Sequence, residues 1–142
     1  MKSHLPRGLR LCNPGNIRAS KEVFAGEIKS SDCCFKRFQN IVWGYRAMFV
    51  ILKTYVHKYK CDTPYAIVNR WAPPIENNVS SYTRAVCAFS GLNPFEKIEL
   101  CETRKMKNIV YAIAKEEQGV EPDRAMIDKA WTMFYNTYKA VI

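Results

Sequence analysis

The sequence predicts an α+β fold that is mostly helical, with a small β-hairpin near the amino terminus. Apolar residues recur at helical spacing in several separate stretches of the chain. By contrast, residues 23–28 and 34–38 are short, rich in β-forming residues and joined by the turn-like sequence KSSD. The chain has 142 residues, enough for one domain with a core and too few for two. We therefore expect a single domain over residues 1–142.

The amino-terminal part of the chain predicts a loop followed by the hairpin. Residues 7–18 (RGLRLCNPGNIR) are expected to form a loop, because Asn-Pro-Gly-Asn favours a tight turn. A third short strand at residues 16–19 would then lie along the edge of the hairpin. The two phenylalanines of residues 35–38 would bury the hairpin against the helices.

The helices begin and end at recognisable signals. Helical spacing of apolar residues covers residues 43–58, 80–90 and 102–118, and it resumes after Glu121-Pro122-Asp123. Thr63 followed by Pro64 predicts the N-cap and the first position of a short helix, which ends near residue 71 before two prolines. Gly91 and Gly119 are expected to end their helices in the left-handed conformation.

Composition and charge indicate the class of partner. Hydrophobic residues make up 48% of the chain, which indicates a folded protein, and the net charge of +9 favours an anionic partner. No apolar run is long enough to span a bilayer, and the first residues lack the apolar core of a secretory signal. We expect synthesis in the cytoplasm, with a phage or a secretion machine as the route to a cell wall. Nucleic acid is the least favoured partner, because Lys and Arg do not cluster and no nucleic-acid motif is present.

The cysteines and histidines do not predict a metal site or a cofactor. The six cysteines form no C-x-x-C pair, and the two histidines do not stand at ligand spacing from them. We interpret most of the cysteines as reduced, small hydrophobic residues. A nucleophilic pair of a cysteine with His57 is an alternative that the spacing does little to favour.

One acidic residue continues an apolar helix face. Met106, Ile109, Val110 and Ile113 recur at helical spacing, and the next position on this stripe is Glu117. Partial desolvation disfavours the charged form of a carboxyl group and raises its pKa, as a general acid for glycoside cleavage requires. The alternative interpretation is that Glu117 lies at the solvated end of an ordinary amphipathic helix.

A set of motifs covers nearly the whole chain. They are NPGNIR, a hairpin, F-x-x-F, GYRA at the start of a long helix, and WAPPxENN followed by a tyrosine. This series resembles small phage-associated and Bacteroidetes proteins that are described as virion structural proteins or as peptidoglycan hydrolases. A more distant resemblance is to flagellar and autolysin-type N-acetylglucosaminidases of the lysozyme-like superfamily. In those enzymes the helix with the catalytic glutamate precedes the motifs, whereas here it follows them, which suggests a circular permutation.

The second resemblance implies a lysozyme-like domain and a role for each of several residues. Glu117 would be the general acid, and an acid of the hairpin would be the base or would stabilise the transition state. Glu27 is the first choice for this second acid, ahead of Glu22 and Asp32. Glu76 is kept as an alternative catalytic acid. The implied substrate contacts are Tyr82, Trp71, Asn16, Arg18 and Asn77.

These implications define two functions. The first is a metal-independent hydrolase of peptidoglycan glycan strands, whose partner is peptidoglycan or another anionic glycan. The second is a non-catalytic virion or glycan-binding protein with the same fold. Gln118 favours the second, because many of the resembling enzymes have serine after the catalytic glutamate.

Overall fold

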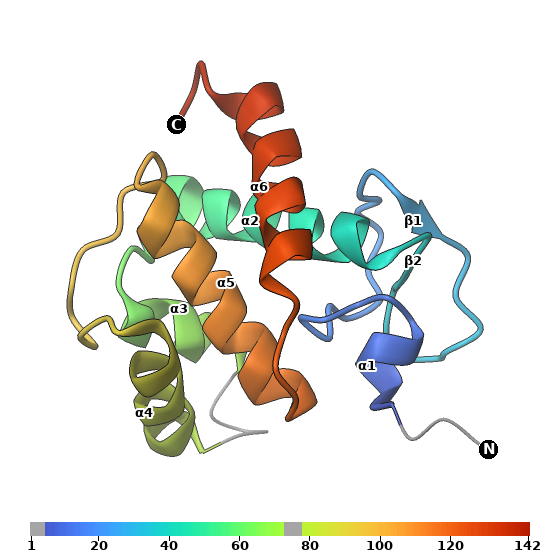
Figure 1. Ribbon diagram of the computed structural model, residues 1–142, viewed down its shortest axis with the longest axis horizontal. Coiled ribbons are helices and arrows are strands. Elements are labelled where there is room, and N and C mark those ends of the chain that lie inside the picture. Colours follow the sequence, from blue (N-terminus) through green and yellow to red (C-terminus); the bar gives the residue numbers. More distant parts are fainter. Residues whose placement is uncertain (1–4, 73–77) are drawn as a thin grey trace.

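A computed structural model of the chain describes residues 5–72 and 78–142. The described residues form six helices and two strands, in the order α1 (Arg7–Arg10), β1 (Glu27–Ile28), β2 (Arg37–Phe38), α2 (Ile41–Tyr59), α3 (Pro64–Trp71), α4 (Val79–Ser90), α5 (Thr103–Gln118) and α6 (Arg124–Tyr138) (Figure 1). The predicted combination of many helices with one small hairpin is confirmed.

The helix signals of the sequence act as expected. The Thr63 side chain accepts a hydrogen bond from the Ala66 backbone N–H and so caps α3, with Pro64 in the first turn. Gly91 and Gly119 follow α4 and α5 with φ angles of 75° and 72°. At α2 the cap is the Asn40 side chain, which accepts from the N–H groups of Val42 and Trp43.

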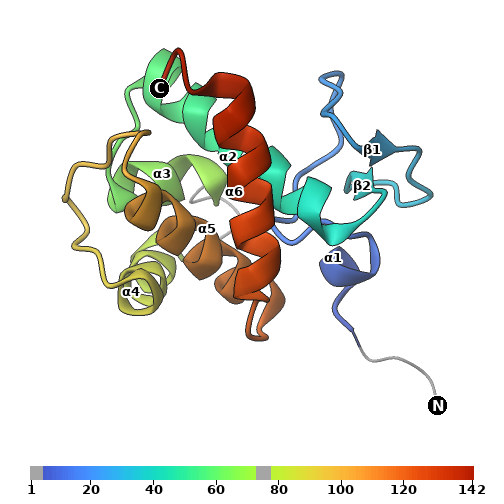
Figure 2. The same cartoon turned by 45° about the horizontal axis from the view of Figure 1, so that its top comes forward.

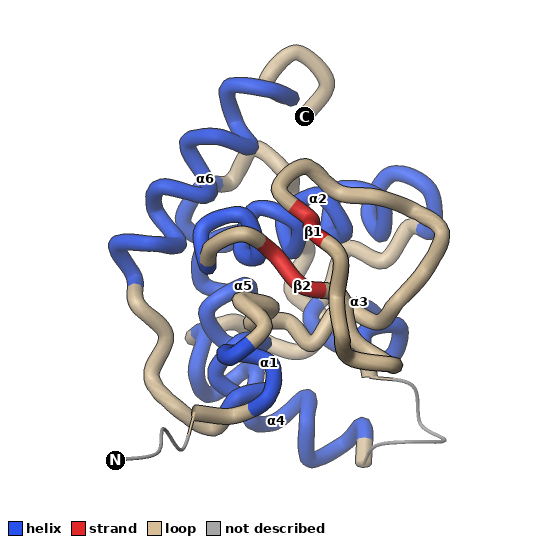
Figure 3. Tube along the Cα trace, turned by 90° about the vertical axis from the view of Figure 1, so that its right-hand side faces the viewer, coloured by secondary structure: helices blue, strands red, loops and turns tan. Residues whose placement is uncertain are grey.

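The hairpin is shorter than predicted. β1 and β2 pair antiparallel, with Glu27 opposite Phe38 and Ile28 opposite Arg37. The expected third strand is reduced to one antiparallel bridge between Arg18 and Phe35. The Asp32 carboxylate accepts from the backbone N–H groups of Cys34 and Phe35, and this local turn takes the place of a longer strand. Figure 3 shows the two short strands with long loops around them.

The prediction of a continuous loop over residues 7–18 is wrong at its start. Arg7–Arg10 form one helical turn, α1, which lies beside the carboxyl-terminal end of α5 (Figures 1 and 3). Gly8 is buried there, and a side chain at this position would collide with Asn16 and Gln118. One turn is too short to produce apolar periodicity, so the sequence pattern gave no sign of it.

The hydrophobic core lies between α5 and its neighbours. α4 packs on α5, and α6 crosses α2 (Figures 1 and 2). The predicted stripe of α5 is confirmed, because Met106, Ile109, Val110 and Ile113 are each at most 1% exposed. Within the described ranges, 5–72 and 78–142, no helix combines the length and the apolar character needed to cross a bilayer.

Candidate functional site

The carboxylate of Glu117 lies where the last turn of α5 meets the loop after α1. Its Oε1 accepts a hydrogen bond of 2.7 Å from the Asn16 amide, and its Oε2 accepts one of 2.6 Å from the Tyr82 hydroxyl. These donors come from the loop and from α4, 101 and 35 residues away in the chain. The fold therefore fixes both carboxylate oxygens from two sides.

Asn16 is oriented by the residue that follows Glu117. The Gln118 amide donates to Asn16 Oδ1 over 3.0 Å and to the Pro14 carbonyl over 2.9 Å. With its oxygen occupied in this way, the Asn16 amide turns its N–H₂ group toward Glu117. Asn16 has a φ of 51°, a left-handed conformation that asparagine tolerates better than most residues. Gln118 therefore supports the Glu117 site, a role that serine would be too short to fill.

The loop itself is held by the buried side chain of Asn13. Its amide donates to the carbonyls of Ile17 and Lys36, and its oxygen accepts from the Ile17 N–H, all within 2.8–2.9 Å. Asn13 is fully buried, so these bonds satisfy backbone groups that water cannot reach. This single side chain ties the loop to the hairpin and gives Asn16 a fixed base.

Trp71, at the end of α3, closes the other side of the loop. Its indole N–H donates to the Gly15 carbonyl over 3.0 Å, and its ring meets Tyr55 edge-on with centroids 5.9 Å apart. The ring is partly buried and lines a cavity. Trp71 thus supports the loop with its polar atom and lines the cavity with its ring.

The cavity beside Glu117 has a volume of about 410 Å³. Its wall includes Asn16, Arg18, Arg70, Trp71 and Glu117. The Arg18 guanidinium lies 5.9 Å from the centroid of the Phe35 ring, which also faces this space. A carboxylate, two guanidinium groups and aromatic rings therefore converge on one hollow of the size of a small ligand site.

Tyr82 lies behind Glu117 and not in the wall of this cavity. It is 6% exposed, and burial, followed by the negative charge of Glu117, raises the pKa of its hydroxyl. The phenol therefore keeps its proton at neutral pH and donates a hydrogen bond to the Glu117 carboxylate. Its contact is with the acid rather than with the cavity.

Glu27, the first choice from sequence for the second acid, is engaged inside the hairpin. Its Oε2 pairs with the Lys36 ammonium over 3.0 Å, and its Oε1 accepts from the Phe24 N–H over 3.0 Å. Lys36 is only 2% exposed and also donates to the carbonyls of Ser20 and Glu22. The structure therefore gives Glu27 a place beside Lys36, outside the residues that line the Glu117 cavity.

Of the remaining acidic candidates, Asp32 and Glu22 are not among the described residues that line the cavity of Glu117. Asp32 caps the turn of residues 32–35 and faces Arg7 at 3.4 Å, and the Cys34 backbone N–H, as the largest of these influences, lowers its pKa. Glu22 lines a second cavity that adjoins the first. Glu76 and Asn77, the alternative acid and its neighbour, lie outside the described residues.

The carboxyl group next to Glu117 also has an altered environment. Partial burial, and then the negative charge of Glu117, raise the pKa of Glu116. Glu116 lies outside the wall of the cavity, and the effect seen here is that of the Glu117 charge on Glu116.

The described cysteines are all free thiols. Asp32, Cys33 and Cys34 are the one group of possible metal ligands that lies close together in the described part of the chain. The two sulfur atoms are 3.2 Å apart, but the Asp32 carboxylate already binds two backbone N–H groups and Arg7. The turn uses Oδ1 and Arg7 faces Oδ2, so a metal ion at this group would compete with Arg7 for the Asp32 carboxylate.

Comparison with known proteins gives one relative. The chain is 32% identical over 120 residues to a protein named Protein P5 of Pseudoalteromonas phage PM2, a match that covers 82% of this chain and 73% of the phage protein. No protein-family model matches the chain.

Proposed function

The chain belongs to the family of Protein P5 of Pseudoalteromonas phage PM2, and from this premise and the Glu117 site we propose that it is a phage-associated hydrolase of peptidoglycan glycan strands. The observation that carries the proposal is the Glu117 carboxylate, held between Asn16 and Tyr82 at the wall of a cavity. A phage particle or a secretion machine would bring the protein to the cell wall.

The position of Glu117 suits a general acid. Both donors are neutral groups, and no ion pair of Glu117 occurs among the described residues. Each carboxylate oxygen has two acceptor positions, so each keeps one that can hold the proton to be donated to the glycosidic oxygen. Glu117 would protonate the leaving oxygen as the glycosidic bond breaks. Asn16 and Tyr82 would then be positioning residues that aim the carboxyl group.

The other residues of the cavity have roles in the same reaction. The Trp71 ring would stack on a sugar face, and Arg18 would hydrogen-bond to N-acetyl or lactyl groups of the substrate. Glu22 becomes the better candidate for the second carboxylate, because it lines the adjoining cavity whereas Glu27 is paired with Lys36. Glu22 would stabilise the oxocarbenium-like transition state or activate water.

We also propose that the fold is a circularly permuted lysozyme-like domain. The support is the contact of Gln118, at the end of α5, with Pro14 and Asn16, which lie more than one hundred residues earlier in the chain. In an unpermuted order these two segments would be consecutive, with the glutamate helix leading directly into the loop. The contact of Gln118 with Pro14 and Asn16 supports a circular permutation, because it brings the end of α5 next to the loop that would follow it directly in the unpermuted chain.

The alternative is a non-catalytic virion protein that keeps the fold and binds glycan. The ion pair of Glu27 with Lys36 favours it, because this pair removes the hairpin acid that the resembling enzymes would use. The two proposals differ in a single observable, the release of new sugar ends.

The test measures new reducing ends and loss of turbidity from purified peptidoglycan of several bacteria. The wild type should release reducing ends, and Glu117→Gln should lose about 10²–10⁴-fold of the rate, the usual contribution of a general acid. Glu27→Gln is the matched control and should keep most of the activity per folded molecule. A wild type that is inert on every wall but co-sediments with peptidoglycan would favour the virion protein. Equal activity of the wild type and Glu117→Gln would contradict Glu117 as the acid.

A further inference from the structure

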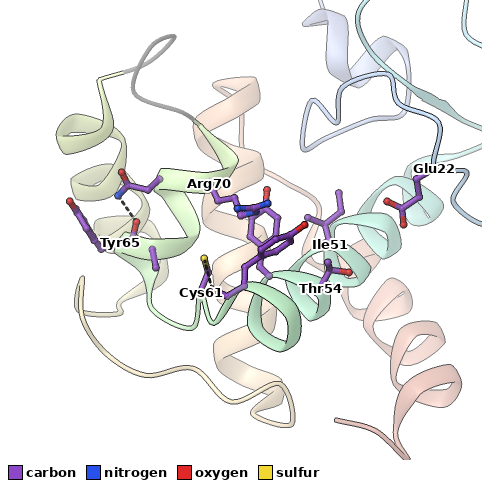
Figure 4. A pocket seen from close by; sticks show the side chains of 10 residues that line it. Glu22, Ile51, Thr54, Cys61, Tyr65 and Arg70 are labelled. Atoms are coloured by element: carbon purple, nitrogen blue, oxygen red, sulfur yellow. Dashed lines mark hydrogen bonds between the residues drawn. The ribbon is translucent and has the colours of Figure 1, made fainter.

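A second and larger cavity continues the one that holds Glu117. It has a volume of about 820 Å³ and lies between α2 and α3 (Figure 4). Ile51, Tyr55 and Arg70 line both cavities, so the two hollows meet at these residues. The result is one groove, with Glu117 in the smaller part and Glu22 at the wall of the larger part. A groove of two connected hollows suits a chain molecule better than a single small ligand.

Arg70 lies where the two hollows meet. Its guanidinium lies 3.4 Å from the centroid of the Tyr59 ring and 5.5 Å from that of Tyr55. Figure 4 shows the Arg70 side chain extending from α3 toward α2. Stacking on a ring holds the guanidinium plane in place and leaves its N–H edges able to bind an anion with two parallel hydrogen bonds.

The charge of Arg70 is not neutralised by the described part of the protein. None of the ion pairs among the described residues includes it, and its side chain is exposed to the groove. An arginine that is preorganised on aromatic rings and lacks a carboxylate partner is suited to bind an anionic group of a ligand.

The aromatic walls indicate what carries that anionic group. Tyr59 and Tyr65 line the larger hollow and are 39% and 45% exposed, although tyrosine rings are usually more buried. Arg70 covers a face of the Tyr59 ring, so Tyr59 offers its hydroxyl group to the polar edge of a sugar, whereas Tyr65 offers a ring face as well. The groove is lined by charged side chains of both signs, Glu22, Glu117, Arg18 and Arg70. Such mixed charges suit a polymer with a negative charge on every unit, such as nucleic acid, less well than one with few charges. A glycan with carboxylates at intervals fits both the rings and the charges.

We propose that Arg70 is a specificity-determining residue that binds a carboxylate of an acid-bearing glycan where the two hollows meet, while Tyr59 and Tyr65 hold the next sugars of the same strand. This inference rests on the proposed function, because it places one strand in both hollows. The acidic sugar would be recognised by its charge at Arg70, and the strand would be aligned so that a glycosidic bond reaches Glu117.

The test compares binding of two glycans to variants in a Glu117→Gln background, which prevents turnover. The ligands are peptidoglycan glycan strands and the same strands with their carboxylates methyl-esterified. Arg70→Gln should weaken binding of the acidic strands about tenfold and leave the esterified strands unchanged, while Arg70→Lys should restore part of the affinity. Lys58→Gln is the matched control: Lys58 also lies over the Tyr59 ring, at 5.3 Å, but lines neither hollow. Its loss should change either affinity less than twofold.

The outcomes separate this inference from the proposed function. If Arg70→Gln weakens both glycans equally, or neither, the role of Arg70 is overturned, whatever the activity of the wild type. If the binding pattern is as expected but the wild type releases no reducing ends, the hydrolase proposal fails and the inference about Arg70 stands. Absence of binding to both glycans overturns the inference. The inference is also overturned if the protein binds single-stranded oligonucleotides in preference to glycan and Arg70→Gln loses that binding. Such a result would identify nucleic acid as the polymer.

Discussion

Glu117 and Glu27 are two carboxylates with the same number of hydrogen bonds and different partners. Glu27 accepts from the buried Lys36 ammonium and from a backbone N–H group within the hairpin. Glu117 accepts from a neutral amide and a neutral hydroxyl, and it lines a cavity. One carboxylate is therefore paired with a cation within the protein, and the other is held by neutral donors at the wall of a cavity.

This difference separates a structural carboxylate from a candidate functional one. A buried ammonium that loses its carboxylate is left as an uncompensated charge, which costs much free energy. A carboxylate whose donors are neutral leaves no such charge behind when it is replaced by an amide. The comparison therefore predicts opposite patterns of stability and activity for variants of the two residues.

The largest expected effect on stability belongs to the hairpin. Glu27→Gln should lower the free energy of unfolding by about 3 kcal/mol, because Lys36 is 2% exposed and would keep its charge without a partner. Glu117→Gln should change it by less than about 1 kcal/mol, because glutamine can still accept from Asn16 or Tyr82. Urea unfolding of both variants measures the difference.

A double variant sharpens this result. Replacement of both partners, Glu27→Leu with Lys36→Met, should recover much of the loss, because it removes the unpaired charge together with the pair. If Glu117→Gln destabilises the protein as much as Glu27→Gln does, Glu117 is also needed for folding stability. That result would contradict the proposed difference between the two carboxylates.

The sequence predicted the position of Glu117 but not the partners of Gln118. The apolar stripe of α5 is a local pattern of helical period, and the resemblance of the NPGNIR loop suggested that Asn16 lies near Glu117. The hydrogen bonds of Gln118 and Asn13 depend on which segments meet across the fold, and no local pattern encodes that. For the same reason the difference from serine at position 118 suggested loss of function, whereas the structure gives Gln118 a supporting contact.

The sequence could not decide between Glu22 and Glu27 as the second acid, because that choice depends on how the two strands pair. Glu22 and Glu27 stand at the two ends of the short stretch EVFAGE, and the sequence could not tell which one faces the helices. Glu27 lies opposite Phe38 in the β1–β2 pair, which brings its carboxylate to the buried Lys36 ammonium. Pairing registers are set by contacts between strands, and strands of two residues leave too little alternation to read.

A smaller effect is expected at Gln118, which acts on Glu117 through Asn16. Gln118→Met keeps the volume but removes the amide that holds Asn16 and Pro14, so Asn16 would no longer be oriented toward Glu117. The expected result is a kcat about tenfold lower with little change in KM, since the cavity wall is intact. The rates of Gln118→Met, Asn16→Ala and the double variant form a cycle. If the two losses in kcat simply multiply in the double variant, Gln118 does not act on Glu117 through Asn16.

The smallest expected effect is at Glu116, where the influence of Glu117 is through charge alone. Partial burial, and then the Glu117 charge, raise the pKa of Glu116 above its ordinary value of 4.5. A raised folded-state pKa means that the ionised group destabilises the native protein at neutral pH, while below about pH 4.5 both states hold the proton and the penalty disappears. Glu116→Gln should therefore raise Tm on the order of 1 °C at pH 7, a size limited by solvent screening, and the gain should vanish toward pH 4.

Asp32 is a control for the pH dependence of Tm, because its substitution should change Tm in the opposite direction to that of Glu116. Its pKa is lowered, first by the Cys34 N–H, so the ionised carboxylate stabilises the folded protein above the ordinary pKa of 3.8 and loses that effect as the pH falls. Asp32→Asn should therefore lower Tm at pH 7 and differ less from the wild type in acid. In a Glu117→Gln background the gain from Glu116→Gln should shrink, because one source of the raised pKa is gone. A gain of unchanged size would mean that burial alone acts on Glu116, and that the charge of Glu117 does not reach its neighbour.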